Sequence, residues 1–479
     1  MIQGKRIIIL GGGFAGLRIA HLLTKQGYDV SLIERSNRLG GMVQTFAHEW
    51  NGGKFLFDYG PHLFFQDYLE VYRELLGNDL LSISDCFRMC TENATLSYPL
   101  RPIEMITHMN PFVSMAYVFD FALQKLGHAS PDDSVEAFMS KRFGRKLFND
   151  FYAPYIEKCC GLPAREVSVL WARERENVSG KSLGDNILKK IGSVISKKVR
   201  ERLTKANDPS AKQITAWYPR LGGGQLCDAM AAALNPDRVI LNSRIAQINL
   251  AGNSVQSVVV ESGGKRQAVS GDYYVSTLPL PDVFGYFQPA FPGMTDVAGK
   301  LEYRCVRLVN LIVGKDRVLD CLEMFSMNRR HIFKRVYEPK AMSDAMAPRG
   351  ASSLCLEVCC FAGDELAEMA PDRLAALCTE QLTELKLLGA TDKVKDSFVV
   401  DMPRAYPVYR KGMEVHRQKL LDVISAMDNL LTTGRQGLFR YHAMTNEVMG
   451  MADSTASFLQ GSRRKENAET QSQWGRLFC

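Results

Sequence analysis

The sequence has no long apolar run and no feature of a secretory leader. Among its 479 residues, no uninterrupted apolar span approaches the roughly twenty residues that a membrane-spanning helix requires. The first apolar run, Ile7–Leu10, is four residues long and ends in glycine, so it cannot form the core of a signal peptide. These absences argue against a spanning helix and predict a cytoplasmic protein.

Recognisable metal sites and hydrolytic motifs are also missing. The 12 cysteines are scattered and none forms a CxxC pair, and the local group Cys355, Cys359 and Cys360 has no histidine nearby. We recognise no serine–histidine–aspartate arrangement that would support hydrolysis. We therefore expect reduced thiols, no metal and no hydrolase.

Charge is mild and mostly dispersed. The net charge is +7 and charged residues make up 23% of the chain, which predicts no nucleic-acid partner. The segment 189–205 is an exception because seven of its residues are basic: Lys189, Lys190, Lys197, Lys198, Arg200, Arg202 and Lys205. A solvated helix face is the ordinary explanation, and a docking site for a membrane surface or an anionic partner is the alternative.

Glycines are concentrated near the first residues of the chain. Ile7–Gly16 reads IIILGGGFAG, so a short apolar strand runs directly into three glycines, with a fourth three positions on. Leu17–Gly27 has helical spacing and Tyr28–Glu34 has the pattern of a second strand. Strand, glycine turn, helix, strand and acid together predict a dinucleotide-binding unit.

Each glycine of this turn has a predicted role. Gly11 permits the tight turn, Gly13 lets the backbone approach a pyrophosphate, and Gly16 lets the helix pack on the strand. Phe14 and Ala15 begin the helix, whose amino terminus would face the phosphates. Glu34 can accept hydrogen bonds from both ribose hydroxyls and would repel a 2′-phosphate, which disfavours NADP.

The residues after Glu34 distinguish FAD from NAD. Arg35–Gly41 reads RSNRLGG and is followed by Met42. This second glycine pair resembles the extended signature of FAD enzymes of the glutathione-reductase type. The resemblance implies FAD as cofactor, with Arg35, Gly41 and Met42 on a loop that runs along the diphosphate.

A second motif follows in Phe55–Phe65, FLFDYGPHLFF. It resembles the YGPH segment of bacterial UDP-galactopyranose mutases and, more loosely, a segment of protoporphyrinogen oxidases. The resemblance implies that Gly60, Pro61 and His62 lie against the isoalloxazine ring. A buried histidine that only shapes the turn is the alternative.

The middle of the chain predicts further parts of the same superfamily. From Tyr68 to about Lys205 the periodicity is helical, and Ser134–Pro163 resembles a segment of protoporphyrinogen-oxidase-like flavoproteins, which implies a helical cap over the substrate. Val239–Ile248 is a predicted strand that, in amine-oxidase-like flavoproteins, passes the adenine, with a backbone contact near Ile245. A meander follows, and Tyr273–Leu280 returns to the main sheet.

The last third predicts an antiparallel sheet and a second glycine turn. Strands are expected at Val306–Val313, Ile332–Tyr337 and Ser353–Cys360, with one long helix over Asp364–Leu388. Arg404–Pro407 begins the return to the cofactor domain. The segment Leu430–Met444 resembles the last motif of galactopyranose mutases in four residues, although Thr445 replaces an acid of that family: Gly434, Arg435, Tyr441 and Met444.

Together these segments predict a fold of class α/β plus α+β. It comprises a Rossmann-like FAD-binding domain of the glutathione-reductase type, an antiparallel-sheet substrate domain and a helical cap. The expected boundaries are 1–75, 213–290 and 396–465 for the FAD domain, 76–212 for the cap, 291–395 for the sheet domain and 466–479 for a polar tail.

The resemblance implies an FAD-dependent oxidoreductase that transfers a hydride from a small-molecule substrate to flavin N5. A redox-neutral sugar-nucleotide mutase is the alternative, and a flavin-bearing protein without turnover is a third class. The candidate catalytic residues are His62, Arg440 and Tyr441, and the candidate substrate-binding residues are Arg101, Arg404 and Tyr406. The sequence leaves open an anionic or nucleotide-sugar substrate, a peripheral membrane contact and a homo-oligomer.

Overall fold

The computed structural model describes residues 4–84, 87–92, 94–98, 111–126, 132–179, 215–389, 391–441 and 445–461. Arg101, Met444, the basic segment 189–205 and the tail 466–479 lie outside the described residues.

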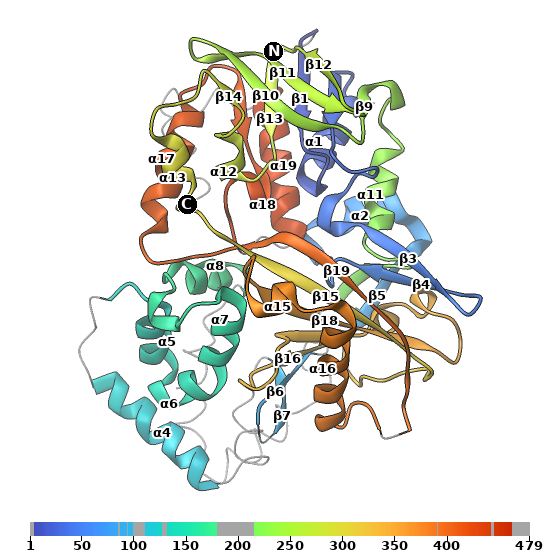
Figure 1. The fold of residues 1–479 in the computed structure, drawn as a ribbon, viewed down its shortest axis with the longest axis vertical. Helices are drawn as coiled ribbons and strands as arrows, with labels where there is room; N and C mark the ends of the chain where they lie inside the picture. Colours follow the sequence, from blue (N-terminus) through green and yellow to red (C-terminus); the bar gives the residue numbers. More distant parts are fainter. Residues whose placement is uncertain are drawn as a thin grey trace.

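A five-stranded parallel sheet organises the first domain (Figure 1). Its order is β20 (Leu430–Thr432), β13 (Tyr273–Ser276), β1 (Arg6–Leu10), β2 (Asp29–Ile33) and β9 (Val239–Ile240). Ile7 and Ile9 pack into one hydrophobic cluster with helices α1 (Phe14–Lys25), α11 (Gly224–Ala231) and α19 (Thr445–Leu459). Ile8 and Leu10 pack into another on the opposite face. Burial on both faces explains why this strand is a continuous apolar run.

The predicted meander lies beside that sheet. It has four strands in the order β12 (Lys265–Val269), β11 (Ser254–Ser262), β10 (Arg244–Ala251) and β14 (Phe287–Gln288). The predicted meander is therefore present, and the strand predicted at Tyr273–Leu280 is β13 of the main sheet. The single strand predicted at Val239–Ile248 is divided into β9 and β10, which belong to different sheets.

A seven-stranded sheet forms the second large unit. Its order is β19 (Val394–Pro407), β15 (Tyr303–Val313), β18 (Ser352–Cys360), β17 (Arg335–Tyr337), β16 (Glu323–Ser326), β6 (Phe87–Cys90) and β7 (Thr95–Tyr98). Strand β18 is buried at all nine positions because it lies between β15 and β17 and is covered on both faces. Five of its six strand pairs are antiparallel, as predicted, and the pair of β16 with β6 is parallel.

Two further antiparallel strand pairs form separate two-stranded sheets. They are β3 (Thr45–Trp50) with β4 (Gly53–Asp58), and β5 (Leu80–Ser84) with β8 (Thr215–Pro219).

A group of helices forms a lobe at the end of the molecule away from β1 (Figure 1). It contains α4 (Pro111–Leu126), α5 (Val135–Phe143), α6 (Arg145–Leu147), a π-helical turn at Phe148–Tyr152, α7 (Ala153–Cys160) and α8 (Leu170–Ser179). The other helices are α2 (Leu69–Leu76), α12 (Leu280–Val283), α13 (Met294–Ala298), α14 (Pro339–Met342), α15 (Glu365–Glu368), α16 (Pro371–Glu384), α17 (Met413–Ser425) and α18 (Gly434–Gly437).

Three sequence-based expectations are corrected here. The helical stretch expected from Tyr68 contains β5, β6 and β7, because β5 and β6 pair with strands far away in the sequence and β7 pairs with β6. The single helix expected over Asp364–Leu388 is divided into α15 and α16, since Met369 is extended and Pro371 starts a new helix. Residues 394–407 pair with β15, so the chain leaves the seven-stranded sheet only after Pro407. The complete division into domains remains a prediction.

Asp58 joins four segments just before the Gly60–Pro61–His62 loop. Its carboxylate is 1% exposed and accepts hydrogen bonds from Thr45 Oγ1 (2.5 Å), Tyr218 Oη (2.6 Å) and the Gly223 N–H (3.2 Å). Its backbone oxygen accepts from Tyr337 Oη at 3.0 Å. Burial raises the pKa of Asp58 from 3.8 to about 6, although these hydrogen bonds act in the opposite direction.

The raised pKa of Asp58 predicts a pH dependence of stability. The folded protein holds this proton more tightly than the unfolded chain, so the stabilisation is complete below about pH 4 and lost as pH rises through about 6. We expect the free energy of unfolding to fall across that window by roughly 3 kcal/mol relative to an Asp58→Asn variant. Denaturant unfolding of both proteins measures this difference, and a difference that is constant with pH would contradict the prediction.

Candidate functional site

The predicted glycine turn connects β1 to α1. The Gly11 N–H donates to Ile33 O at 2.9 Å, which ties the turn to β2. A Cβ on Gly16 would lie 2.0 Å from Gly11 O, so only glycine allows the helix to pack this closely. A Cβ on Gly13 would meet no protein atom within 4 Å, so the protein itself does not require glycine there. That pattern fits a turn in which Gly13 leaves room for a bound pyrophosphate.

Glu34 lies beside this turn, immediately after β2. Its carboxylate accepts hydrogen bonds from the Gly12 N–H (2.8 Å) and from the N–H and Oγ of Ser36 (both 2.9 Å). These donors fix both carboxylate oxygens next to the glycine turn. Oε1 already accepts two hydrogen bonds, whereas Oε2 accepts one and retains a further lone pair. The carboxylate is therefore oriented to accept ribose hydroxyls.

The loop that follows Glu34 packs directly on the turn. The Gly40 N–H donates to Gly12 O at 2.7 Å, and a Cβ on Gly41 would lie 3.0 Å from Gly13 Cα. Met42 is half-buried in the 3₁₀ turn Gly41–Val43. The loop therefore lies against the part of the turn that is expected to face the diphosphate.

Arg35 and Ile245 lie on the β2 side of the same turn. Arg35 is exposed and lines an open pocket of about 510 Å³ with Ser36, Asn242, Arg244, Glu261, Gly263 and Gly264. The Ser243 N–H donates to Glu34 O at 3.0 Å, which fixes the start of β10 next to Glu34. Ile245, two residues on, is buried and lies at an irregularity in the β10–β11 pairing.

The second predicted glycine turn contacts the first. A Cβ on Gly434 would lie 2.8 Å from Ala15 Cβ, so the start of α18 lies against the start of α1. Arg435 Nε donates to Tyr441 O at 3.3 Å, and its buried Nη2 has no hydrogen-bond partner within the described residues. An unpaired guanidinium nitrogen near two glycine turns fits a site that receives a polar group of a cofactor or substrate.

Taken together, the residues present fit an FAD molecule. The Gly11–Gly16 turn and the Gly40–Gly41 loop would hold its diphosphate, and Glu34 would hold its ribose.

The Gly60–Pro61–His62 loop lies against a buried carboxylate. A Cβ on Gly60 would be 3.7 Å from Glu357 Oε1 and 3.8 Å from His62 Cε1. Burial lowers the pKa of His62 to about 4, and the positive charge of Arg335 acts in the same direction. His62 is therefore uncharged at neutral pH. Its Nδ1 is buried and has no hydrogen-bond partner in the described structure.

Glu357 is the centre of a buried ion cluster. Lys334 Nζ lies 2.7 Å from Glu357 Oε2, and Arg335 forms ion pairs with Glu357 and, at 2.8 Å, with Glu323. The side chains of Lys334 and Glu357 are 4% and 2% exposed. Burial would raise the pKa of Glu357, but the charges of Arg335 and Lys334 outweigh it and lower that pKa to about 2. Glu357 is therefore ionised across the physiological range, whereas burial raises the pKa of Glu323.

Two tyrosines extend the cluster. Tyr406 Oη donates to Glu357 Oε2 at 3.3 Å, and Lys334 Nζ lies 4.0 Å from the centroid of the Tyr406 ring. The rings of Tyr406 and Tyr441 are stacked with centroids 5.1 Å apart, and Trp171 lies 5.7 Å beyond Tyr441. The guanidinium of Arg435 lies 4.9 Å from the Tyr406 ring. The structure thus brings the predicted residues Tyr406, Tyr441 and Arg435 together.

Two predicted arginines have other partners. Arg404 forms an ion pair with Asp282, and its side chain is 44% exposed. Arg440 Nε lies 3.6 Å from Glu174 Oε1, and Glu174 also accepts a hydrogen bond from Tyr409 Oη at 2.9 Å. The Tyr409 oxygen in turn accepts from the Tyr441 N–H at 2.9 Å. Arg440 therefore lies in the group of side chains, with Glu174 and Tyr409, that supports Tyr441. Arg404 lies in an ion pair at the surface.

The ion cluster was not predicted from the sequence. Glu357 is the one charged residue of the strand Ser352–Cys360, and Lys334–Arg335 precedes a short buried strand. A lone acid in a fully buried strand must have a cationic partner, so this signal was available.

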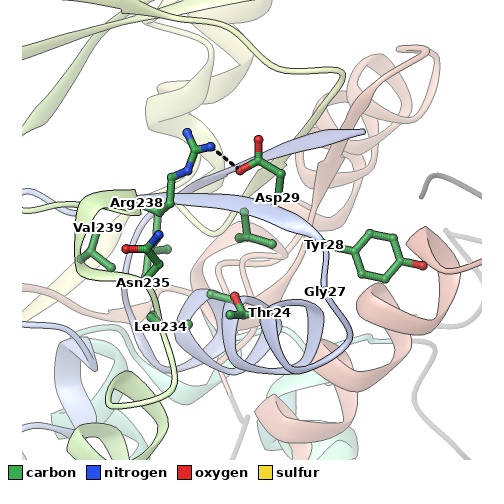
Figure 2. Close-up of a pocket in the computed structure, with 11 residues that line it drawn as sticks. Thr24, Gly27, Tyr28, Asp29, Leu234, Asn235, Arg238 and Val239 are labelled. Atoms are coloured by element: carbon green, nitrogen blue, oxygen red, sulfur yellow. Dashed lines mark ion pairs between the residues drawn. The ribbon is translucent and has the colours of Figure 1, made fainter. Parts of the chain in front are cut away.

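A separate pocket of about 300 Å³ lies at the opposite end of β2 (Figure 2). It is lined by residues including Thr24, Tyr28, Asp29, Asn235 and Arg238, and an ion pair of 3.0 Å joins Asp29 to Arg238. Because Asp29 begins β2 and Glu34 follows its end, this pocket is not the cofactor site.

Comparisons with known proteins agree with the assignment of FAD as the cofactor. Residues 14–410 match the family described as flavin containing amine oxidoreductase. Protoporphyrinogen oxidase 2 of Arabidopsis thaliana, described as chloroplastic/mitochondrial, is 24% identical over 467 residues, covering 89% of this chain and 88% of that protein.

Solved structures show the same fold. A reduced UDP-galactopyranose mutase has a TM-score of 0.79 and 18% identity, covering 98% of this chain and 95% of that chain. A putative protoporphyrinogen oxidase from Exiguobacterium sp. 255-15 has a TM-score of 0.69 and 14% identity, with 96% and 100% covered. At these identities the similarity concerns the fold. No helix among the described residues is long and apolar enough to cross a membrane.

Substitutions at Glu34 and Gly13 test the cofactor assignment. Glu34→Ala removes a charge-assisted acceptor worth roughly 1.5–3 kcal/mol, so we expect FAD affinity to fall about ten- to a hundredfold. Gly13→Val should weaken binding further, because its side chain would occupy the space next to the turn. Flavin released by acid from the purified proteins measures occupancy.

Glu49→Ala, which changes an exposed acid on β3, is the matched control and should retain wild-type occupancy. Full FAD content in both the Glu34 and Gly13 variants would refute the assignment of this turn.

Proposed function

Because this chain belongs to the flavin containing amine oxidoreductase family and is an FAD-dependent oxidoreductase, we propose that it oxidises a small molecule by hydride transfer to flavin N5. We place the reaction where the Gly60–Pro61–His62 loop meets Tyr406 and Tyr441. The bond broken would be a C–H bond next to nitrogen or oxygen, or within a ring. When bound, FAD supplies the acceptor for the hydride.

The ion cluster around Glu357 is the observation that carries this proposal. Four charged side chains, Glu323, Lys334, Arg335 and Glu357, are buried beside the predicted flavin loop. Burying such charges is expensive, and replacing them by apolar residues is often neutral or stabilising. Strongly shifted pKa values next to a cofactor loop are typical of reaction sites.

The cluster would act by holding neighbouring groups in place. Glu357 fixes the hydroxyl of Tyr406 and the ammonium group of Lys334. The stacked rings of Tyr406 and Tyr441 would then present an aromatic surface to an apolar part of the substrate. Arg435, with its unpaired Nη2, would donate a hydrogen bond to a polar or anionic group.

His62 would shape the site without transferring a proton. At neutral pH it is uncharged, because its pKa is lowered to about 4, so it is a poor general acid. This assigns His62 a positioning role and leaves Arg101, which lies outside the described residues, as an untested candidate for substrate binding.

A redox-neutral mutase is the second candidate function. It is favoured by Tyr59–His62, which matches the YGPH segment of galactopyranose mutases, and by the unpaired donor of Arg435. The residues next to the cofactor are compatible with both reactions, so the redox state required for turnover must distinguish them.

Anaerobic spectroscopy tests the proposal directly. On our proposal the yellow protein with oxidised flavin can react without prior reduction, because the substrate delivers its electrons to the flavin. A screen of amines, cyclic substrates and nucleotide-sugars should therefore find a compound that bleaches the flavin spectrum without oxygen. Product should accumulate only when an electron acceptor is present.

A mutase would behave in the opposite way, since it returns its electrons and requires reduced flavin. Activity that appears only after dithionite treatment, with a nucleotide-sugar isomerised and no acceptor consumed, would establish the mutase and overturn our proposal. The Glu34→Ala protein is the control for both reactions, because it should lose flavin and either activity together.

Substitution of His62 tests its positioning role. We expect His62→Ala to slow flavin reduction without abolishing it. The pH profile of kcat/KM should keep its shape, because an uncharged His62 contributes no ionisation near its ordinary pKa of about 6.5. Stopped-flow reduction measures both quantities. A lost inflection in that range, or complete inactivity with FAD still bound, would show that His62 is a proton-transfer residue.

A further inference from the structure

Helix α4 exposes an apolar face. The side chains of Phe112, Met115, Val118, Phe119 and Leu123 are 81%, 68%, 45%, 68% and 51% exposed. Five of the nine large apolar side chains that are exposed in the described structure thus lie on one 16-residue helix. Single exposed apolar residues are ordinary, but a continuous helix face of this kind marks an interaction site.

Tyr117 and Asp120, two polar residues of α4, contact the lobe. Tyr117 and Phe121 are buried against the lobe, and Tyr117 Oη donates to Asp150 Oδ2 at 2.9 Å. Asp120 accepts a hydrogen bond from the Lys146 N–H at 2.8 Å. The charge of Asp120 is therefore used inside the lobe, and the water-facing side of α4 is its apolar side, the reverse of an ordinary surface helix.

The helices behind α4 are basic. α5 and α6 pack on α4 and carry Lys141, Arg142, Arg145 and Lys146, with Glu136 as their one acid. Three of the four basic residues, Lys141, Arg145 and Lys146, are exposed. Lys146 forms an ion pair of 3.2 Å with Asp150. An exposed apolar helix face with exposed basic residues on the two helices packed against it is suited to the boundary between the acyl chains and the anionic headgroups of a bilayer. A face-to-face pairing of two copies would instead gather like charges at one interface.

We propose that α4 is a membrane-docking helix that lies in the headgroup region of an anionic bilayer. Phe112, Met115, Phe119 and Leu123 enter the acyl boundary, and the basic residues of α5 and α6 contact lipid phosphates. At about 1.5 Å per residue, a 16-residue helix is about 24 Å long, which is shorter than the roughly 30 Å apolar core, so the helix lies in the plane of the interface.

Vesicle flotation of the complete protein tests this surface. We expect binding to vesicles of phosphatidylcholine with about one-third phosphatidylserine, and weaker binding to phosphatidylcholine alone. The triple variant Phe112→Ser, Met115→Ser, Phe119→Ser should lose at least about tenfold in partitioning, because three large apolar groups no longer enter the lipid. The matched control is Leu221→Ser with Val415→Ser, which removes exposed apolar residues elsewhere and should bind as the wild type does.

Charge reversal provides a second arm. Lys141→Glu with Arg145→Glu should remove the preference for phosphatidylserine while leaving the residual binding to neutral lipid. A preference that survives this change would overturn the proposed role of the basic residues.

A third variant guards against misfolding of the triple variant. Phe119→Trp preserves an aromatic side chain, and its emission, after subtraction of the wild-type spectrum, should shift to shorter wavelength when anionic vesicles are added. No shift, or triple-variant binding equal to that of the wild type, would overturn the proposal. A dimer in solution that the triple variant abolishes, without vesicle binding by the wild type, would assign this face to a second copy instead.

Discussion

The carboxylate of Glu357 connects the parts of the molecule that form the candidate site. It lies on β18, an interior strand of the seven-stranded sheet. It forms ion pairs with Lys334 and Arg335 and accepts a hydrogen bond from the hydroxyl of Tyr406. It also lies against the loop at Gly60. Among the described residues Lys334 has Glu357 as its ion-pair partner, whereas Arg335 also pairs with Glu323. Removing one partner of a buried pair destabilises a protein by roughly 3–5 kcal/mol, so Lys334 depends on this acid. The positions of β17, β19 and the Gly60 loop therefore depend on one side chain.

A second constraint is the absence of side chains at the cofactor turn. Close contacts of Gly41 with Gly13 and of Gly434 with Ala15 bring two distant segments against the β1–α1 turn, within which Gly16 packs on Gly11. The parallel sheet places these turns at the carboxyl ends of β1, β2 and β20, where ligands bind in open α/β sheets. The sheet thus positions the cofactor end of the site, and the Glu357 cluster positions the other end.

The sequence predicted the parts of this arrangement that are encoded locally. The β1–α1–β2 unit, Glu34 and the meander follow from spacing and glycine placement, and a separation of a few residues suffices to recognise them. Strands β5 and β6 were missed because their partners β8 and β16 lie far away in the sequence, and β7 was missed with them because it pairs only with β6 among the described strands. Arg404 was assigned to the substrate side because an arginine near the cofactor domain suggests an anion site. Its guanidinium instead forms an ion pair with Asp282, 122 residues away in the sequence. The ion cluster was missed for the same reason, since three strands contribute to it.

The charge balance of the cluster bears on what the site can receive. Glu323 and Glu357 neutralise Lys334 and Arg335, and His62 is uncharged at neutral pH. Arg435 has no ion pair within the described residues, so it supplies the net positive charge beside Tyr406. In a buried environment that charge favours a negative group, whether on the cofactor or on the substrate, far more than it would in water. The stacked tyrosines offer no charge, so the part of a ligand that contacts them should be apolar. A ligand with one anionic end and one apolar end satisfies both surfaces.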